Sequence, residues 1–301
     1  MQPIPQQRIV EKLDAYMARR DYAGAERHLL YWLEEARAEG DERGELMVRN
    51  ELVGHFRKTG DRDRALTHGK EALRLVGALG FERTISAGTT YTNVATACNA
   101  FGENERSLEL FRKAAEIYEG TPGTDPRLLG GLYNNMALTC VALGRFAEAD
   151  VLYDKALATM AQVENGELEQ AITYLNRADA ILAHAQAEAK AQSAQNGERA
   201  SAPIGGAETS VGGGIGGEAS TAGGGTEDAE DETAILAAAA CEDAIAECLD
   251  AALELLNTPS IPHDGYYAFV CEKCAPAFAF HGYFLADQDL RQRAKEIYER
   301  P

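Results

Sequence analysis

Small residues recur at a fixed period in this sequence of 301 residues, and this repeat limits the possible folds more than any other feature. Gly60, Gly102 and Gly144 lie 42 residues apart, and two further sets of small residues keep the same spacing. These sets are Ala65, Ser107 and Ala149, and Ala72, Ala114 and Ala156. Periods of about 20–50 residues are typical of stacked supersecondary units. Because one such unit cannot bury its apolar face alone, the sequence predicts an array of packed repeats.

Each period is interpreted as two helices. In the third period, residues 128–143 carry apolar side chains at helical spacing, Gly144 interrupts the pattern, and residues 146–160 carry a second apolar face. Glycine suits the left-handed conformation that ends a helix, and alanine fits where two helices approach closely. Aromatic residues make up only 7% of the chain, which favours closely packed helices over a sheet sandwich. We therefore expect an all-α fold.

Two segments resemble the turn and the start of the second helix in tetratricopeptide repeats: Thr-Gly-Asp-Arg-Asp-Arg-Ala at 59–65 and Leu-Gly-Arg-Phe-Ala-Glu-Ala at 143–149. With its period of 42 residues and Tyr-Asn-Asn-Met-Ala at 133–137, the chain is similar to the kinesin-light-chain type of repeat. The resemblance is clearest over residues 45–160. It departs from the family at Arg62 and Asn104, where an aromatic residue is usual. The resemblance implies a right-handed TPR-type α-solenoid that binds other proteins and does not catalyse a reaction.

Weaker repeats flank this region, and one of them is interrupted. Residues 8–36 predict a first hairpin and residues 265–299 a last one, while the hairpin that begins near Glu167 has its second helix much later than the period requires. Residues 192–229 are rich in Gly, Ala, Ser and acids, a composition that predicts a disordered insert into which the flanking helices extend. We thus expect five or six hairpins, with repeats in 1–191, the insert in 192–229, and helices that complete and cap the solenoid in 230–301.

Charge limits the partners. The net charge is −19, which disfavours binding to nucleic acid, because that affinity comes mainly from cationic contacts, and disfavours anionic membranes for the same reason. No Lys or Arg lies between Arg199 and Lys273, so this stretch is either a solubilising surface or a docking site for a basic partner. The sequence has no pattern of a signal peptide or of a membrane span. We expect a cytoplasmic protein with reduced cysteines.

No motif indicates an enzyme or a cofactor. Gly-Gly-Gly-Ile-Gly-Gly at 212–217 matches a dinucleotide-binding spacing, but it lacks the preceding strand and the following helix that such a site needs. Cys271 and Cys274 have the spacing of a metal or redox pair, and Cys241 and Cys248 could complete a zinc site. We interpret these cysteines as packing residues, with zinc or redox chemistry as the alternatives. The sequence contains neither His-Glu-x-x-His nor Gly-x-Ser-x-Gly.

The resemblance also implies a binding surface, because in this type of repeat the first helix of each hairpin lines a concave groove. The position nine residues before the turn glycine, where the family places asparagines that contact a peptide backbone, holds Glu51, Asn93 and Asn135. Asn176 lies within one residue of the next such position. An amide can pair with a main-chain N–H and C=O together. The alternative is that these amides bond between adjacent helices or cap local turns.

Further along the same first helices, Asn99, Arg57 and Lys58 could add polarity or contact a carboxylate of the ligand. Aromatic residues gather near the end of the chain, at Tyr266, Tyr267, Phe269, Phe278, Phe280, Tyr283 and Phe284. We expect them to form a terminal core, or else an aromatic pocket at the end of the groove.

The favoured function is therefore non-catalytic binding of a protein or peptide in the concave groove, without a cofactor. Two alternatives remain: a sensor of signal peptides that acts through a separate effector, and a metal-binding protein built on the cysteines.

Overall fold

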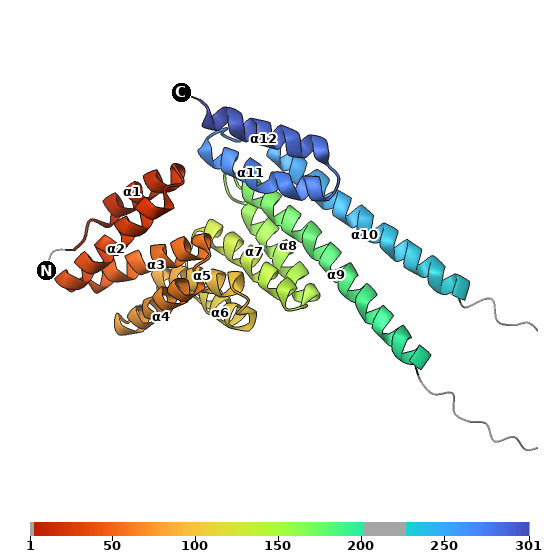
Figure 1. The fold of residues 1–301 in the computed structure, drawn as a ribbon, viewed down its shortest axis with the longest axis horizontal. Helices are drawn as coiled ribbons and strands as arrows, with labels where there is room; N and C mark the ends of the chain where they lie inside the picture. Colours follow the sequence, from red (N-terminus) through yellow and green to blue (C-terminus); the bar gives the residue numbers. More distant parts are fainter. Residues whose placement is uncertain (1–2, 202–226, 301) are drawn as a thin grey trace, which may run out of the picture. The chain divides into compact units, whose positions relative to one another are not determined.

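A computed structural model describes residues 3–201 and 227–300, and every regular element in these ranges is an α-helix (Figure 1). The twelve helices of the described residues form successive pairs, which confirms the all-α prediction. The helices are α1 (Gln6–Ala18), α2 (Tyr22–Glu39), α3 (Glu42–Thr59), α4 (Arg62–Ala78), α5 (Ile85–Ala100), α6 (Asn104–Gly120), α7 (Pro126–Ala142), α8 (Phe146–Met160), α9 (Glu167–Ser201), α10 (Glu227–Leu256), α11 (Gly265–Phe280) and α12 (Phe284–Tyr298).

The chain forms two compact units, residues 1–173 and residues 174–301. Helix α9 begins in the first unit and continues into the second. Both α9 and α10 extend into the insert expected at 192–229, since α9 ends at Ser201 and α10 begins at Glu227. The remainder of that insert, with the glycine motif at 212–217, lies outside the described residues. The division at 192 and 229 therefore stays a prediction.

Aspartates start the second helix of the first hairpin and both helices of the second. The carboxylates of Asp21, Asp41 and Asp61 accept hydrogen bonds from backbone N–H groups one turn later, at 2.8, 2.9 and 3.1 Å. This caps N–H groups that have no partner within the helix. The repeated glycines lie where the first helix of a hairpin ends, in the left-handed region, with φ of 78° at Gly60 and 80° at Gly102. Their 42-residue spacing thus places the turns.

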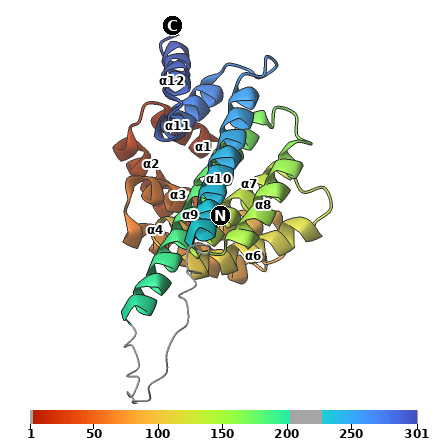
Figure 2. The same ribbon diagram turned by 90° about the vertical axis from the view of Figure 1, so that its right-hand side faces the viewer.

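Small residues let the helices of the first unit pack closely. The two sets of alanine and serine that carry the repeat are all buried. A further pair, Gly88 and Gly130, also lies 42 residues apart and is buried, on α5 and α7. Gly88 touches the ring of Tyr118 on α6, and Gly130 lies against Met160 on α8. Each contact joins the two helices of one hairpin, and the paired helices α7 and α8 are seen in Figure 2.

The first helices of the hairpins in this unit form one layer. Helix α3 packs against α5 and α5 against α7, whereas no pair of second helices among the described residues packs as extensively. Helices on the inner side of a curved array approach one another more closely than those on the outer side. The first unit therefore curves with α3, α5 and α7 on its inner face, as the repeat type implies.

Arg62 and Asn104, which replace the usual aromatic residues, form polar links at their turns. Nη2 of Arg62 donates to Oε1 of Glu103 at 2.5 Å, which joins the second hairpin to the third. Oδ1 of Asn104 accepts from Nδ2 of Asn99 at 3.4 Å. Polar contacts, one between hairpins and one within the third hairpin, thus take the place of an aromatic packing contact.

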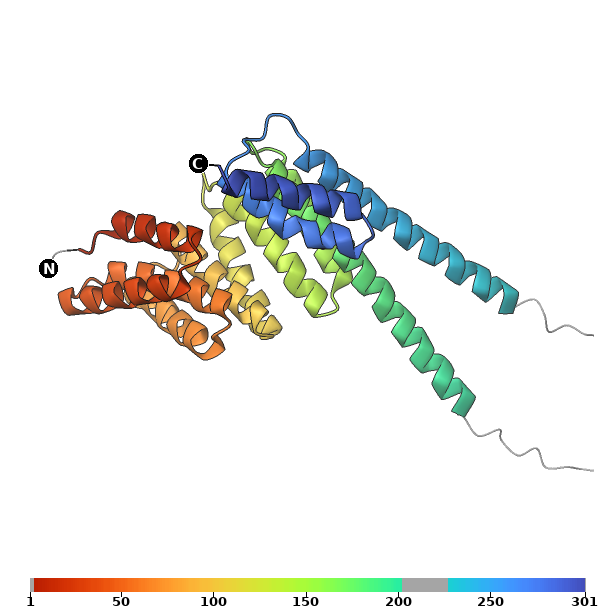
Figure 3. The same ribbon diagram turned by 45° about the horizontal axis from the view of Figure 1, so that its top comes forward.

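The second unit is built around the hairpin of α11 and α12, which lie side by side (Figure 3). Tyr267 and Phe278 on α11 are fully buried. The hydroxyl of Tyr267 donates to the carbonyl of Leu256 at 3.2 Å and accepts from Nη1 of Arg293 at 2.9 Å, which links α11 to α10 and α12. Asp179 on α9 pairs with His281 at 3.2 Å. These contacts tie together the four helices of this unit.

In the second hairpin the half-buried ring of His68 lies against a buried arginine. Arg49 is buried, pairs with Glu45 at 2.6 Å, and donates from Nη1 to Nδ1 of His68 at 3.1 Å. His68 must be neutral to accept this bond. Burial first, and then the charge of Arg49, lower the pKa of His68 to about 4.

We expect Gly88→Ala to destabilise the chain, by about 1–3 kcal/mol, because the new methyl group would overlap the buried, rigid ring of Tyr118. Gly130→Ala should cost less, because its methyl group would meet the flexible thioether of Met160. Gly54, which has open space where a methyl group would lie, is the control, and Gly54→Ala should be neutral or stabilising. Urea denaturation of the three variants gives their free energies of unfolding and thus the order of destabilisation. An equal loss in all three would contradict close helix contact at Gly88.

The free energy of unfolding should fall as the pH drops from about 6.5 towards 4, because the unfolded chain binds a proton at His68 that the folded chain excludes. His68→Gln should remove about 1–3 kcal/mol of this loss. Urea denaturation at pH 7 and pH 5 tests it, with the exposed His184→Gln on α9 as the control. The same pH dependence in wild type and His68→Gln would show that the His68 ring titrates freely in the fold.

Candidate peptide-binding surface

Two asparagines lie at equivalent places on the inner face of the first unit. Asn93 is on α5 and Asn135 on α7, one period apart on helices that pack against each other. Both side chains are half-buried, and neither amide has a hydrogen-bond partner within residues 3–201 and 227–300. Buried polar groups are usually paired, so two half-buried amides without partners are available to an external one.

Two other asparagines of the same layer have a different role. Nδ2 of Asn99 on α5 donates to Oγ1 of Thr139 on α7 at 2.9 Å, and Nδ2 of Asn50 on α3 donates to Oγ1 of Thr90 on α5 at 3.0 Å. These bonds join the first helices of neighbouring hairpins. Asn99 was a candidate for ligand contact, but its amide nitrogen is already engaged in the architecture.

The sequence analysis predicted no role for Asn50, although the spacing between the bonded residues would have indicated one. Both bonded pairs consist of an amide and a hydroxyl separated by 40 residues, just under one period. A side chain 40 residues after the amide lies on the first helix of the next hairpin, across the interface between the two helices. A separation just under one period therefore indicates a bond between hairpins.

The inner face is uncharged on α5, which has no ionisable acid or base except the phenol of Tyr91 and the thiol of Cys98. The hydroxyls of Thr92 and Thr96 donate to carbonyls of their own helix at 2.9 and 2.8 Å. They therefore present a neutral surface around Asn93. On α7 the only charged residue is Arg127, in the first turn.

Helix α3 brings charge to one end of this surface. Glu51, at the position of the asparagines, is half-buried, and burial followed by the nearby carboxylate of Asp14 raises its pKa. Arg57 is exposed and has no ion-pair partner in the described part of the chain, while the surrounding protein lowers its pKa by excluding water. Lys58 lies over the ring of Tyr22, 5.5 Å from its centre. A guanidinium without a partner is thus available beside the neutral strip.

Asn176, the fourth asparagine of the prediction, lies on α9 in the second unit and is half-buried. It belongs to a different compact unit from Asn93 and Asn135.

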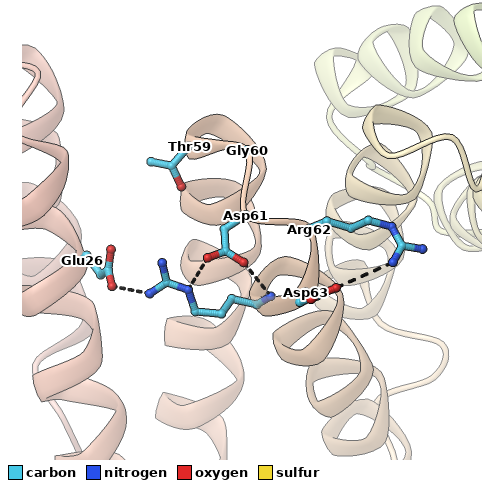
Figure 4. A pocket seen from close by; sticks show the side chains of 7 residues that line it. Glu26, Thr59, Gly60, Asp61, Arg62 and Asp63 are labelled. Carbon is cyan, nitrogen blue, oxygen red and sulfur yellow. Dashed lines mark hydrogen bonds and ion pairs between the residues drawn. The ribbon is translucent and has the colours of Figure 1, made fainter.

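An open pocket of about 600 Å³ lies between the first and second hairpins (Figure 4). Its walls include Glu26, Asp61 and Arg64. Arg64 pairs with both Glu26 and Asp61, and Arg62 pairs with Glu103 outside the pocket. Because these cations are already matched with carboxylates, the pocket has the character of an ion-pair link between hairpins rather than of a ligand site.

The cysteines of the second unit are free thiols in α10 and α11; Cys248, Cys271 and Cys274 are buried and Cys241 is half-buried. Burial raises the pKa of Cys274 to about 12 and also raises that of Cys271. Thiolates, not thiols, bind zinc and attack disulfides. Among the residues that the structure describes, no group of three or more His, Cys, Asp or Glu side chains is placed to hold a metal ion.

Comparisons with known proteins identify the repeat in the middle of the first unit. Residues 86–162, which span α5 to α8, match the family model of the tetratricopeptide repeat. Residues 86–162 are therefore tetratricopeptide repeats, as the sequence predicted, and stacked helical pairs continue on either side of them. Such repeats generally form scaffolds that mediate protein–protein interactions and are typically non-catalytic.

Solved structures with the same fold are kinesin-light-chain-like repeat proteins. BtubC (BKLC) from P. vanneervenii superposes with a TM-score of 0.53 at 19% identity, covering 70% of this chain and 87% of that one. The Q17M variant of a putative kinesin light chain from Podosopora anserina, with nearly identical TPR-like repeats, gives 0.52 at 19% identity, covering 66% and 96%. No curated protein matches the sequence. Within the described ranges, no helix has the length and apolar character needed to cross a bilayer.

We expect Cys271→Ala with Cys274→Ala to lower the free energy of unfolding by about 1–3 kcal/mol, because both thiols fill the buried side of α11. In the wild type, a thiol reagent should modify these two cysteines only after unfolding, since burial keeps them protonated and covered. Denaturation curves and a thiol titration measure the two effects. Stoichiometric zinc in protein purified in metal-free buffer would instead support the metal site.

Proposed function

We propose that the inner face of the first unit binds an extended segment of a partner protein, with no catalytic step. One observation carries the proposal: the amides of Asn93 and Asn135 are half-buried, one period apart, and unpaired within the described residues. The neighbouring Asn50 and Asn99 supply the contrast, because their amides are used between helices. Among the residues described, Asn50 and Asn99 thus join neighbouring hairpins, whereas Asn93 and Asn135 do not.

An extended peptide has the complementary chemistry. Its backbone presents N–H and C=O groups at regular intervals, and a carboxamide can pair with one of each. Each such bond contributes about 0.5–1.5 kcal/mol net. Because the amides are held on packed helices, this unit loses little conformational entropy when the peptide binds.

The charges on this surface favour a particular ligand group, a carboxylate, at one end only. Around Asn93 the surface is neutral, so main-chain pairing there would tolerate varied side chains. Arg57 is exposed and unpaired among the residues described, and it would favour a segment with a carboxylate at that end. The net charge of −19 argues against nucleic acid as the ligand.

Asn93→Ala with Asn135→Ala should weaken peptide binding about tenfold or more, because at least two hydrogen bonds are lost. The melting temperature should stay within a few degrees, because neither amide bonds to the rest of the described fold. Peptides selected from a random display library against the full-length chain provide the probe, and fluorescence anisotropy gives the affinities.

Asn99→Ala is the matched control. It removes the bond to Thr139, so it should lower the melting temperature while the folded protein keeps its affinity for the selected peptides. Replacing a peptide amide by an ester at the contact should weaken binding to the wild type but not to the double variant. If the double variant binds like the wild type, or loses stability as Asn99→Ala does, the asparagines do not bind a ligand.

A further inference from the structure

A second pocket, of about 450 Å³, lies where the loop after α4 meets α5 and α6. Pockets that bind small molecules commonly have volumes of about 300–1,000 Å³. Its lining combines two cations with two carboxylates, which belong to Arg83 and Lys113 and to Glu82 and Glu116. None of the four forms an ion pair within residues 3–201 and 227–300, whereas the arginines of the first pocket are matched with carboxylates. The charges of the second pocket are thus available to a ligand.

Tyr91 on α5 forms one wall of this pocket, and the ammonium group of Lys113 lies over its ring, 5.9 Å from the ring centre. The hydroxyl of Tyr91 has no hydrogen-bond partner in the described part of the chain. Burial first, and then the charge of Glu82, raise the pKa of Tyr91, so the hydroxyl stays protonated and can donate. A phenol and an ammonium group side by side favour an anionic acceptor.

The same pair of side chains recurs one period later, and there a carboxylate is the acceptor. Tyr133 and Lys155 lie 42 residues after the tyrosine and the lysine of the pocket, with the ammonium group 5.3 Å from the ring centre. The hydroxyl of Tyr133 donates to Oε1 of Glu119 on α6 at 2.8 Å. The residue one period before Glu119 is Gly77 on α4, which has no side chain to offer. The pocket therefore has the donors of this arrangement without its carboxylate.

Glu82 distinguishes the pocket from its counterpart. Oε1 of Glu82 lies 3.9 Å from the point where a Cβ atom on Gly77 would be, but it accepts no hydrogen bond from Tyr91. The equivalent position one period later holds Thr124, which is uncharged. The carboxylate of Glu82 would repel a simple anion at Tyr91, but it would attract an ammonium group beside that anion. A ligand that carries a carboxylate next to an ammonium group satisfies both sides of the pocket.

We infer that this pocket binds a small zwitterion of the amino-acid class. The carboxylate of the ligand accepts from the hydroxyl of Tyr91 and pairs with Lys113, and its ammonium group pairs with Glu82. The two remaining charges of the lining cancel, so the pocket does not favour a ligand of large net charge. Tyr91 lies two residues before Asn93, which sets the two side chains on different faces of α5. The site is therefore distinct from the peptide-binding surface proposed above.

Binding of the common L-amino acids to the full-length chain, measured by isothermal titration calorimetry, tests the inference. At least one of them should bind, and its N-acetyl and carboxamide forms should each bind about tenfold or more weakly, because each form lacks one of the two charges. Tyr91→Phe should weaken binding of this amino acid about tenfold, because a hydrogen bond to a carboxylate is lost. Tyr133→Phe makes the same change one period later and should leave the affinity unchanged.

Gly77→Glu places in the pocket the side chain that its counterpart has, so it should weaken binding of the amino acid about tenfold or more. Gly77→Ala is its matched control, because it adds helix propensity without a carboxylate and should keep the affinity of the wild type. Glu82→Gln should also weaken binding, because it removes the partner of the ammonium group. Asn93→Ala with Asn135→Ala should bind the amino acid normally, which separates this site from the inner face.

The inference is overturned if no amino acid binds at millimolar concentration, or if the N-acetyl or carboxamide form binds as tightly as the amino acid. An unchanged affinity in Tyr91→Phe would overturn it as well. Equal or tighter binding by Glu82→Gln would show that Glu82 does not hold the ligand but competes with it, which is a further contradiction. Circular dichroism checks that each variant keeps its helices.

Discussion

Close contact between helices at small residues is the constraint on which the rest of the first unit depends. Gly88 lies directly against the ring of Tyr118, and the repeated alanines are buried where the two helices of each hairpin meet. At this separation the backbone of one helix packs on side chains of the next, with no room for a larger residue. The spacing of the hairpins, and hence the register of their inner faces, follows from these contacts.

This register gives the asparagines two distinct roles. An amide that lies across the interface of two first helices, such as Asn50 or Asn99, finds a threonine hydroxyl in the neighbouring hairpin. An amide at the middle of the inner face, such as Asn93 or Asn135, finds no partner among the described residues. The same type of side chain therefore joins hairpins in one position, and in another it would bind the partner under the proposed function.

The sequence predicted the repeat well because glycine and alanine carry direct information about turns and close contacts. The helix pairs, the left-handed glycines at the turns and the buried alanines could all be predicted from the 42-residue period. The role of Asn99 could not, because it depends on the hydroxyl of Thr139 in another hairpin, which periodicity alone does not place.

The aromatic residues near the end of the chain show a second limit. Tyr267 and Phe278 form a terminal core as expected, but Tyr266, Phe269 and Phe280 are exposed. A helix apolar on every side has no periodicity that distinguishes its buried face from its exposed one. Only the packing of α11 against α12 and α10 makes that distinction.

Side-chain amide exchange, measured by nuclear magnetic resonance on the chain without a ligand, tests the central claim most directly. The account predicts that the amide protons of Asn93 and Asn135 exchange rapidly with water, while those of Asn50 and Asn99 are protected by their bonds to Thr90 and Thr139. Equal protection of all four amides would contradict it, because Asn93 and Asn135 would then be bonded within the fold and would have nothing to offer a partner.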